Sequence, residues 1–210
     1  MKIPLEKRLR KRMHVEIGYL QDEVVEVLYS FMDDLVLHGG TAVWRCYGGN
    51  RFSENLGFYG RFEKEIIKNR LEARGLKVSK IKTTENLLFA KISNGNAEIR
   101  VEINKKLINK RVIAAYERMD GSFIDIYALG VDDLVREKME AYNSRRFIRD
   151  LYDIYHLVRS FDISPDVKKE VRDFAEKVVL PVDESIIKSI VYSSVPPTFR
   201  TMVSYLRLIK

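Results

Sequence analysis

The stretch that decides the fold runs from Leu37 to Phe58 and reads L-H-G-G-T-A-V-W-R-C-Y-G-G-N-R-F-S-E-N-L-G-F. It begins at the end of a short apolar run, Leu35 to Leu37, which predicts a strand. Gly39 and Gly40 follow, and glycines let the backbone adopt conformations closed to other residues and let a ligand approach closely. A helix opening at Thr41 would offer free amide groups that favour an anion. The pattern predicts a phosphate-binding turn, although most Gly-Gly pairs are only turns.

The segments around this stretch alternate between helix and strand patterns. Apolar residues at helical spacing predict one helix over about His14 to Asp33 and another over Arg61 to Arg74. Asn94-Gly95-Asn96 is a strong signal for a hairpin turn. Five strands are predicted, at Leu76–Thr83, Leu87–Ser93, Ala97–Asn104, Val112–Glu117 and Phe123–Tyr127.

After Gly130 the pattern changes to helices only. The first starts at Val131-Asp132-Asp133-Leu134, where Asp132 or Asp133 would serve as the cap. Further helices are predicted at Arg146–Ser160, from Ser164-Pro165 onward, at Asp183–Ser193 and at Phe199–Ile209. The order of elements predicts an α+β domain over residues 1–129, a mixed sheet with flanking helices, followed by an all-α domain over residues 130–210.

Composition narrows the class of protein. A chain of 210 residues with 46% hydrophobic and 32% charged residues is globular. The net charge of +7 favours acidic partners such as nucleic acid or nucleotide phosphates, although many basic proteins bind neither. The basic cluster within residues 5–12 fits nucleic-acid contact or the solvated start of a helix. A single cysteine excludes an internal disulfide, and the charged N-terminus and lack of long apolar runs predict a cytoplasmic protein without membrane contact.

Two motifs carry a resemblance to a known family. The first is G-G-T-A followed by R-F-S-E-x-L-x-F, between Gly39 and Phe58. The second is E-K-M-E-A-Y-N-S-R-R-F-I-R-D-L-Y-D-I-Y-H-L, between Glu137 and Leu157. Together they resemble the AbiEii-type toxins of the nucleotidyltransferase superfamily. The resemblance implies a nucleotidyltransferase-like sheet, an NTP substrate and a divalent metal, Mg²⁺ or Mn²⁺.

The resemblance also implies roles for particular residues. Lys138 would contact the nucleotide phosphates and Asp153 would be a catalytic acid residue. From spacing alone, Lys138 and Arg145 lie two helical turns apart and face the same way. Arg149 and Asp153 could pair on one helix face, and Asp150 is better suited to tying two helices together than to chemistry. The nucleotide-binding set implied by the motifs is Gly39, Gly40, Thr41, Arg51, Ser53 and Arg145.

Arg51 has two readings from its own chemistry. A guanidinium can fork onto a phosphate, and the neighbouring Gly-Gly turn favours that role. The alternative is a surface arginine in a polar loop.

The metal ligands depart from the family pattern. There the second strand carries Asp-Leu-Asp, whereas this chain has Asn55-Leu56-Gly57. Asn offers a neutral carbonyl and Gly offers no side chain. Glu102 takes the place of a third family carboxylate, and Glu98 on the same strand face could share the role. Either glutamate also fits the exposed face of a half-buried strand. A metal held by Glu102 and Asn55 would bind much more loosely than one held by three carboxylates.

Two functions of different class follow. The first is a nucleotidyltransferase that moves a nucleoside monophosphate from NTP to an acceptor, either tRNA or another RNA or a protein, with a cognate antitoxin as partner. Its activity would be weakened or lost because Asn55 and Gly57 replace both aspartates. The second is a degenerate relative that binds nucleotides or partners without catalysis. The two substitutions also fit deliberate silencing of a toxic protein.

Overall fold

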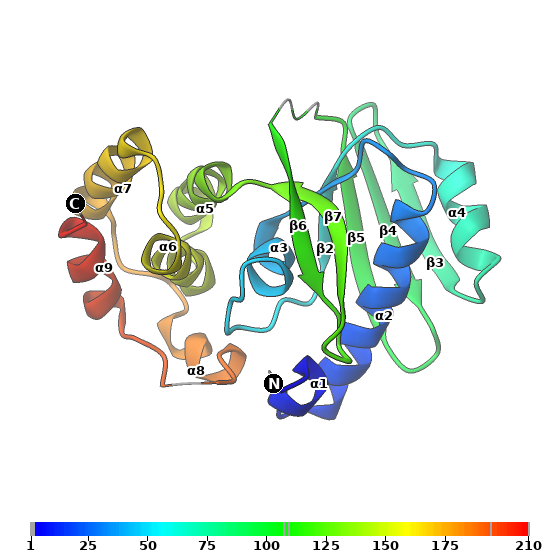
Figure 1. The fold of residues 1–210 in the computed structure, drawn as a ribbon, viewed down its shortest axis with the longest axis horizontal. Helices are drawn as coiled ribbons and strands as arrows, with labels where there is room; N and C mark the ends of the chain where they lie inside the picture. The colour runs from blue at the N-terminus through cyan, green and yellow to red at the C-terminus, as the bar shows by residue number, and fades with distance from the viewer. Residues whose placement is uncertain (1–2, 107, 109, 194, 210) are drawn as a thin grey trace. The chain divides into compact units, whose positions relative to one another are not determined.

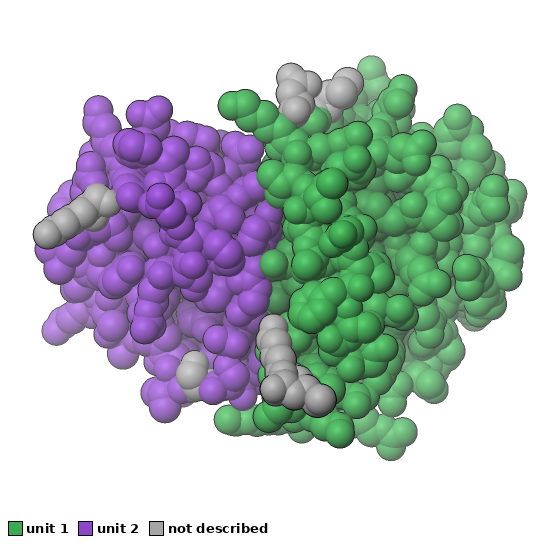
Figure 2. Space-filling model, in the orientation of Figure 1, with its two compact units in different colours: residues 1–46, 53–129 green, residues 47–52, 130–210 purple. Residues whose placement is uncertain are grey.

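The structure is a computed structural model that describes residues 3–106, 108, 110–193 and 195–209 (Figure 1). The chain divides into two compact units (Figure 2). Unit 1 comprises residues 1–46 and 53–129, and unit 2 comprises residues 47–52 and 130–210. We call Tyr47–Phe52 the inserted segment, because it interrupts unit 1 in sequence and groups with unit 2. The division read from the sequence, at 129/130, left these six residues in the first domain.

Unit 1 is built on a seven-stranded mixed sheet with the order β3-β4-β5-β2-β1-β7-β6. β2 pairs antiparallel with β1 and parallel with β5, while β1 pairs parallel with β7. The remaining neighbours are antiparallel. The strands are β1 Val36–His38, β2 Leu56–Tyr59, β3 Lys77–Thr83, β4 Leu87–Ser93, β5 Glu98–Asn104, β6 Arg111–Glu117 and β7 Phe123–Leu129.

Alternation of apolar and polar side chains gives the β3–β5 part of the sheet one buried and one exposed face. In β5, Ile99, Val101 and Ile103 are buried, while the residues between them are exposed. Helices α2 (Arg12–Tyr29) and α4 (Lys64–Glu72) pack against β5 and β3 and against each other (Figure 1). They cover the apolar face, so the side chains of opposite parity along β5 face solvent.

Two short helices complete unit 1. α1 spans Leu5–Arg8, and Arg8 forms an ion pair with Glu117. α3 spans Gly39–Arg45 and follows β1 directly. The guanidinium of Arg45 is buried and pairs with Asp22 of α2. Asp22 also accepts hydrogen bonds from the Tyr116 hydroxyl at 3.1 Å and from the Met119 amide at 2.8 Å, so this buried carboxylate is satisfied on both oxygens.

Unit 2 is helical apart from the inserted segment. Its helices are α5 Val131–Arg145, α6 Ile148–Ser160, α7 Pro165–Lys177, the 3₁₀ helix η1 Glu184–Ile186, α8 Ile187–Ile190 and α9 Phe199–Arg207. α5 packs on α6 and α7, and α9 packs on α6 and α7. Arg146 ends α5 in the left-handed conformation, with φ of 53°, and so separates it from α6.

The predicted α+β fold, a mixed sheet with flanking helices followed by helices only, is confirmed. The five later strands lie within two residues of their predicted bounds. Two expectations about the helices of unit 2 are wrong. Gly130 caps α5; Asp132 instead accepts a hydrogen bond from the Ser164 amide, and Asp133 pairs with Arg136. The predicted helix over Asp183–Ser193 ends at Ile190, because Val191 turns extended and bridges to Arg51.

Candidate functional site: a glycine turn and a buried charge cluster

The glycine turn joins β1 to α3 in unit 1. Gly39 has φ of 73°, which a residue with a side chain rarely adopts, and the helix begins at Gly39 rather than at Thr41. Thr41 is 1% exposed, and its hydroxyl donates to the backbone oxygen of Asn55 at 2.6 Å and lies 3.0 Å from the Ser53 hydroxyl. These contacts of Thr41 and Ser53 therefore hold the loop that leads into β2.

Gln21 of α2 also holds this loop, and no motif in the sequence predicted that role. Its side-chain nitrogen donates to the backbone oxygens of Ser53 at 2.8 Å and Glu54 at 3.0 Å. The side chain is fully buried on α2. The sequence signal for this contact is a polar residue between the apolar positions Leu20 and Val24, which helical spacing places on the buried face of α2.

Two of the predicted metal positions, Gly57 and Glu102, lie on one row across the sheet, whereas Asn55 precedes β2. Gly57 pairs with His38 on β1 and with Glu102 on β5. Partners opposite one another on neighbouring strands project from the same face. The imidazole of His38 stacks on Tyr59 with ring centroids 3.9 Å apart. A Cβ added at Gly57 would lie 3.1 Å from Nε2 of His38, so the imidazole crowds the place from which a side chain at position 57 would start.

These residues do not fit a divalent metal of the Mg²⁺ type. Glu102 is exposed and is the only carboxylate on the row, and Asn55 is exposed with its backbone oxygen already bound by Thr41. Glu98 is drawn to Lys91, whose Nζ lies 2.7 Å from Oε1. Within the described ranges no group of three His, Cys, Asp or Glu residues could hold a metal ion. Mg²⁺ prefers six oxygen ligands in octahedral geometry, with carboxylates supplying the charge.

The second part of the candidate site is a cluster of buried charges in unit 2. Nε and Nη2 of Arg51 donate to the two carboxylate oxygens of Asp153, which is fully buried. Nζ of Lys138 lies 2.9 Å from Oδ2 of Asp153 and 3.5 Å from Oδ1 of Asp150. Arg145 donates from Nε and Nη2 to Asp150 at 2.7 and 2.8 Å. Three cations thus share two carboxylates, and Asp150 ties α5 to α6 as its spacing suggested.

Opposite charges decide the protonation state of Asp153. Burial alone would raise the pKa of its carboxyl, but Arg51 and Lys138 outweigh that effect and hold the pKa below its ordinary value. For Arg51, burial lowers the pKa of the guanidinium, while Asp153 more than compensates and raises it. The pair therefore stays ionised. Arg149, four residues before Asp153, instead lies over the Phe147 ring at 5.0 Å.

Backbone contacts fix the inserted segment within unit 2. The Phe52 amide donates to the backbone oxygen of Ile190 at 2.9 Å, and the Tyr192 amide donates to that of Asn50 at 3.1 Å. A ring nitrogen of His156 lies 2.8 Å from the backbone oxygen of Tyr47. Arg51 reaches Asp153 from a segment that is held along its length.

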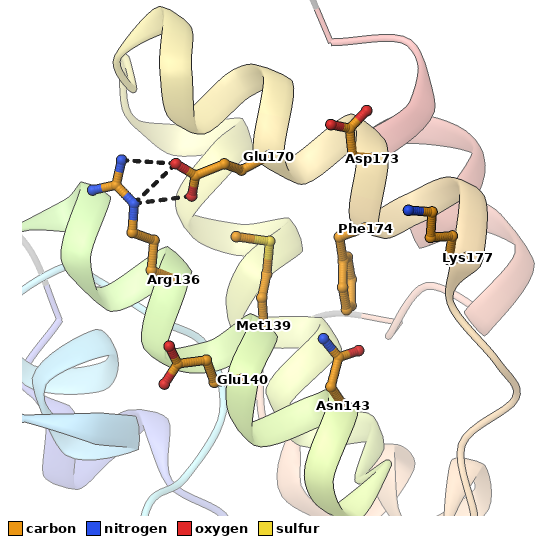
Figure 3. Close-up of a pocket in the computed structure, with 8 residues that line it drawn as sticks. All are labelled: Arg136, Met139, Glu140, Asn143, Glu170, Asp173, Phe174 and Lys177. Atoms are coloured by element: carbon orange, nitrogen blue, oxygen red, sulfur yellow. Dashed lines mark hydrogen bonds and ion pairs between the residues drawn. The ribbon is translucent and has the colours of Figure 1, made fainter.

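A separate hollow in unit 2 contains none of the predicted site residues. It lies between α5 and α7, where Arg136 forks onto Glu170 with nitrogen–oxygen distances of 2.9 to 3.2 Å (Figure 3). Charged side chains of both signs surround two apolar ones. Its lining consists of Arg136, Met139, Glu140, Asn143, Glu170, Asp173, Phe174 and Lys177.

Solved structures share the fold. A protein of Helicobacter pylori, JHP933, superimposes with a TM-score of 0.67 at 17% identity, over 95% of this chain and 94% of its own. A candidate nucleotidyltransferase from the same organism gives 0.66 at 17% identity, over 94% and 96%. MenT4, a nucleotidyltransferase toxin from Mycobacterium tuberculosis, gives 0.63 at 18% identity, over 94% and 83%. The fold is therefore that of the nucleotidyltransferases.

The chain itself belongs to the family described as the nucleotidyl transferase AbiEii toxin of type IV toxin–antitoxin systems, whose model matches residues 25–190. The family resemblance read from the two motifs is thereby confirmed. Among curated protein sequences, none matches this chain. Helices long and apolar enough to cross a membrane are absent from the part of the chain that the structure describes.

Proposed function

We propose that this chain binds a nucleoside triphosphate on unit 1 and transfers a nucleoside monophosphate from it only slowly, to an RNA or protein acceptor. Family membership supports the nucleotidyltransferase class. The observation that carries the weakened activity is the row His38–Gly57–Glu102, in which one exposed carboxylate stands where the family pattern has several. Loss of metal-ligating carboxylates would remove several kcal/mol of transition-state stabilisation.

The glycine turn supports nucleotide binding. Gly39 and Gly40 are half-buried and carry no side chain, so phosphates could approach the backbone closely. The loop beside the turn is held in place by Gln21 and Thr41, so little ordering entropy remains to be lost on binding. We propose these as the contributions of unit 1, with no step assigned to a metal.

The charge cluster supports a structural role first. Arg51 uses three of its nitrogens on Asp153 and the Phe52 backbone oxygen, and Lys138 is 4% exposed between two aspartates. We propose that these residues hold the inserted segment in unit 2. Their implied contacts with nucleotide phosphates, and those of Arg145, remain predictions.

A second candidate is a nucleotide-binding or interaction module without catalysis. The crowding of Gly57 by His38 favours it, because the ring leaves less room for a ligand where the family places a carboxylate. The first candidate and the nucleotide-binding form of the second share nucleotide binding and differ in transfer, whereas the interaction form needs neither.

Two measurements separate them. Calorimetry with each NTP, with and without Mn²⁺, tests binding; absence of any heat would overturn the first candidate and the nucleotide-binding form of the second. Incubation with labelled NTP, Mg²⁺ or Mn²⁺, total RNA and total protein tests transfer. Slow labelling supports the first candidate, and none supports the second.

Restored and control variants calibrate the transfer assay. Asn55→Asp with Gly57→Asp should accelerate labelling. Asn69→Asp with Asn96→Asp adds the same charge at two exposed positions of unit 1 and should not. If the restored variant labels no faster than this control, the placement of the site on β2 is wrong.

The family also implies a toxin with an antitoxin partner. Expression of the restored variant should arrest growth if the chain descends from such a toxin, and co-expression of the antitoxin should relieve the arrest. Unchanged growth with soluble, folded protein would contradict the toxin role.

A further inference from the structure

Three cations stand side by side on the exposed face of β3, β4 and β5. In the strand register, Lys80 lies opposite Lys91, and Lys91 lies opposite Arg100. Opposite residues on neighbouring strands project from one face with Cβ atoms about 5 Å apart, where like charges destabilise the sheet. Contact among the three cations therefore does not itself stabilise the sheet.

An aromatic ring lies in the adjacent row. In the strand register, Phe89 lies between Lys82 on β3 and Glu102 on β5. Nζ of Lys80 lies 5.9 Å from the centroid of the Phe89 ring. Phe89 is half-buried, so part of the ring is accessible. The same row continues through Glu102 to Gly57, beside the glycine turn.

Acidic side chains neutralise only part of this face. Lys91 forms an ion pair with Glu98. In the part of the chain that the structure describes, Lys80, Lys82 and Arg100 form no ion pair with a carboxylate within 4.0 Å, and all three are exposed. Lys80 and Lys82 remain available to an outside anion, and Arg100 does so in part, because its charge also helps to lower the pKa of Glu98.

Protection of a sheet edge explains only some of these residues. β3 is an edge strand, and lysines on an edge discourage pairing with another chain. Lys80 and Lys82 fit that role. Lys91 and Arg100 lie on β4 and β5, inside the sheet, where no edge needs protection.

We propose that this surface, the basic sheet face (Lys80, Lys82, Phe89, Lys91 and Arg100), binds single-stranded RNA. Cations in register across strands about 4.8 Å apart would contact successive phosphates, and Phe89 would stack on a base. An acidic protein would satisfy the cations but gain little from the ring. The inference rests on the proposed function in one respect, because it makes RNA the acceptor and leads it along unit 1 toward the glycine turn.

RNA binding is tested without NTP or metal, by fluorescence anisotropy of a labelled 12-nucleotide RNA of mixed sequence at several salt concentrations. The variant Lys80→Gln, Lys82→Gln, Arg100→Gln should weaken binding at least tenfold. It should also lower the slope of log affinity against log salt by about 2, since each phosphate contact on a single strand contributes about 0.7. The matched control Lys169→Gln, Lys177→Gln, Lys188→Gln removes three exposed charges of unit 2 and should leave both values near wild type.

A second variant tests the stacking. Phe89→Leu keeps an apolar side chain and the charges, and should weaken RNA binding about fivefold or more because a stacked base contributes about 1–3 kcal/mol. Thermal unfolding of all variants checks the fold, and the triple variant should unfold no earlier than wild type because it relieves like-charge pairs.

Several outcomes would overturn the inference. Equal weakening by the triple variant and its control means non-specific charge attraction. Poly-glutamate that competes as well as unlabelled RNA points to an acidic protein. Oligomerisation of the triple variant with unchanged RNA affinity means edge protection alone. Intact RNA binding with no nucleotidyl transfer would overturn the proposed transfer activity and leave this inference standing. Normal transfer to RNA by the triple variant would overturn this inference and leave the proposed transfer activity standing.

Discussion

Arg51 and Asp153 lie 102 residues apart in sequence and form a bidentate ion pair inside unit 2. Such a fork is the strong form of a charge-assisted hydrogen bond, and here both side chains are almost wholly removed from solvent. Lys138 completes the neutralisation of the carboxylate. A group implied by the family to be a catalytic acid is therefore also the anchor of the inserted segment, and experiments must separate the two roles.

The first prediction concerns that anchor. Asp153→Asn should lower the free energy of unfolding by about 3–5 kcal/mol, because it leaves the buried charges of Arg51 and Lys138 undercompensated. Urea unfolding followed by circular dichroism measures the change. Asp173→Asn, at an exposed position on α7 beyond its first turn, is the control and should change it by less than about 0.5 kcal/mol. A loss below about 1 kcal/mol for Asp153→Asn would contradict the structural role.

The second prediction is the pH dependence of the same contribution. The folded-state pKa of Asp153 is depressed, so its stabilisation is fully present above the unfolded value of about 3.9 and is lost as pH falls through the folded value. The difference in unfolding free energy between wild type and Asp153→Asn should be constant from about pH 6 to 8 and shrink below about pH 4. A difference that grows on acidification would show that Asp153 is protonated in the folded chain.

Local patterns sufficed for most of the fold. The alternation of Ile99, Val101 and Ile103 fixed β5 and its buried face, and Asn94-Gly95-Asn96 fixed the turn before it, where Gly95 has φ of 91°. These features depend on residues a few positions apart, for which side-chain periodicity and turn chemistry are direct signals.

The candidate site depended on distant partners and could be predicted only in part. The motif around Arg51 predicted that this residue belongs to the site. It did not predict the ion pair with Asp153, because no residue near Arg51 in sequence points to that partner. Thr41 followed the Gly-Gly turn and looked like a ligand, yet its hydroxyl is buried against Asn55. Gln21 gave no motif at all. A hydrogen-bonding side chain in a sequence does not reveal which of several partners the tertiary structure will supply.

The third prediction tests Gln21. Gln21→Met keeps the side-chain volume but leaves the Ser53 and Glu54 backbone oxygens without their donor, so the free energy of unfolding should fall by about 1–3 kcal/mol. Amide hydrogen exchange should accelerate over residues 53–57. Glu23→Met, exposed on the same helix, should have neither effect. Unchanged exchange in this loop with a large loss of stability would mean that Gln21 supports the α2 packing rather than the loop.

The last prediction concerns the crowding of Gly57 by His38. Alanine should stabilise a strand by about 0.5–1 kcal/mol over glycine, but at 3.1 Å from Nε2 its Cβ would force the imidazole to shift. Gly57→Ala should therefore change the unfolding free energy little in the wild type and stabilise the His38→Ala variant by about that amount. A double-mutant cycle measures this coupling. The same crowding should affect metal binding. The variant Asn55→Asp, Gly57→Asp should bind Mn²⁺ more tightly when it also carries His38→Ala. Equal affinity with and without the imidazole would show that it moves aside freely, and the absent carboxylates alone would then account for the proposed weakening of the site.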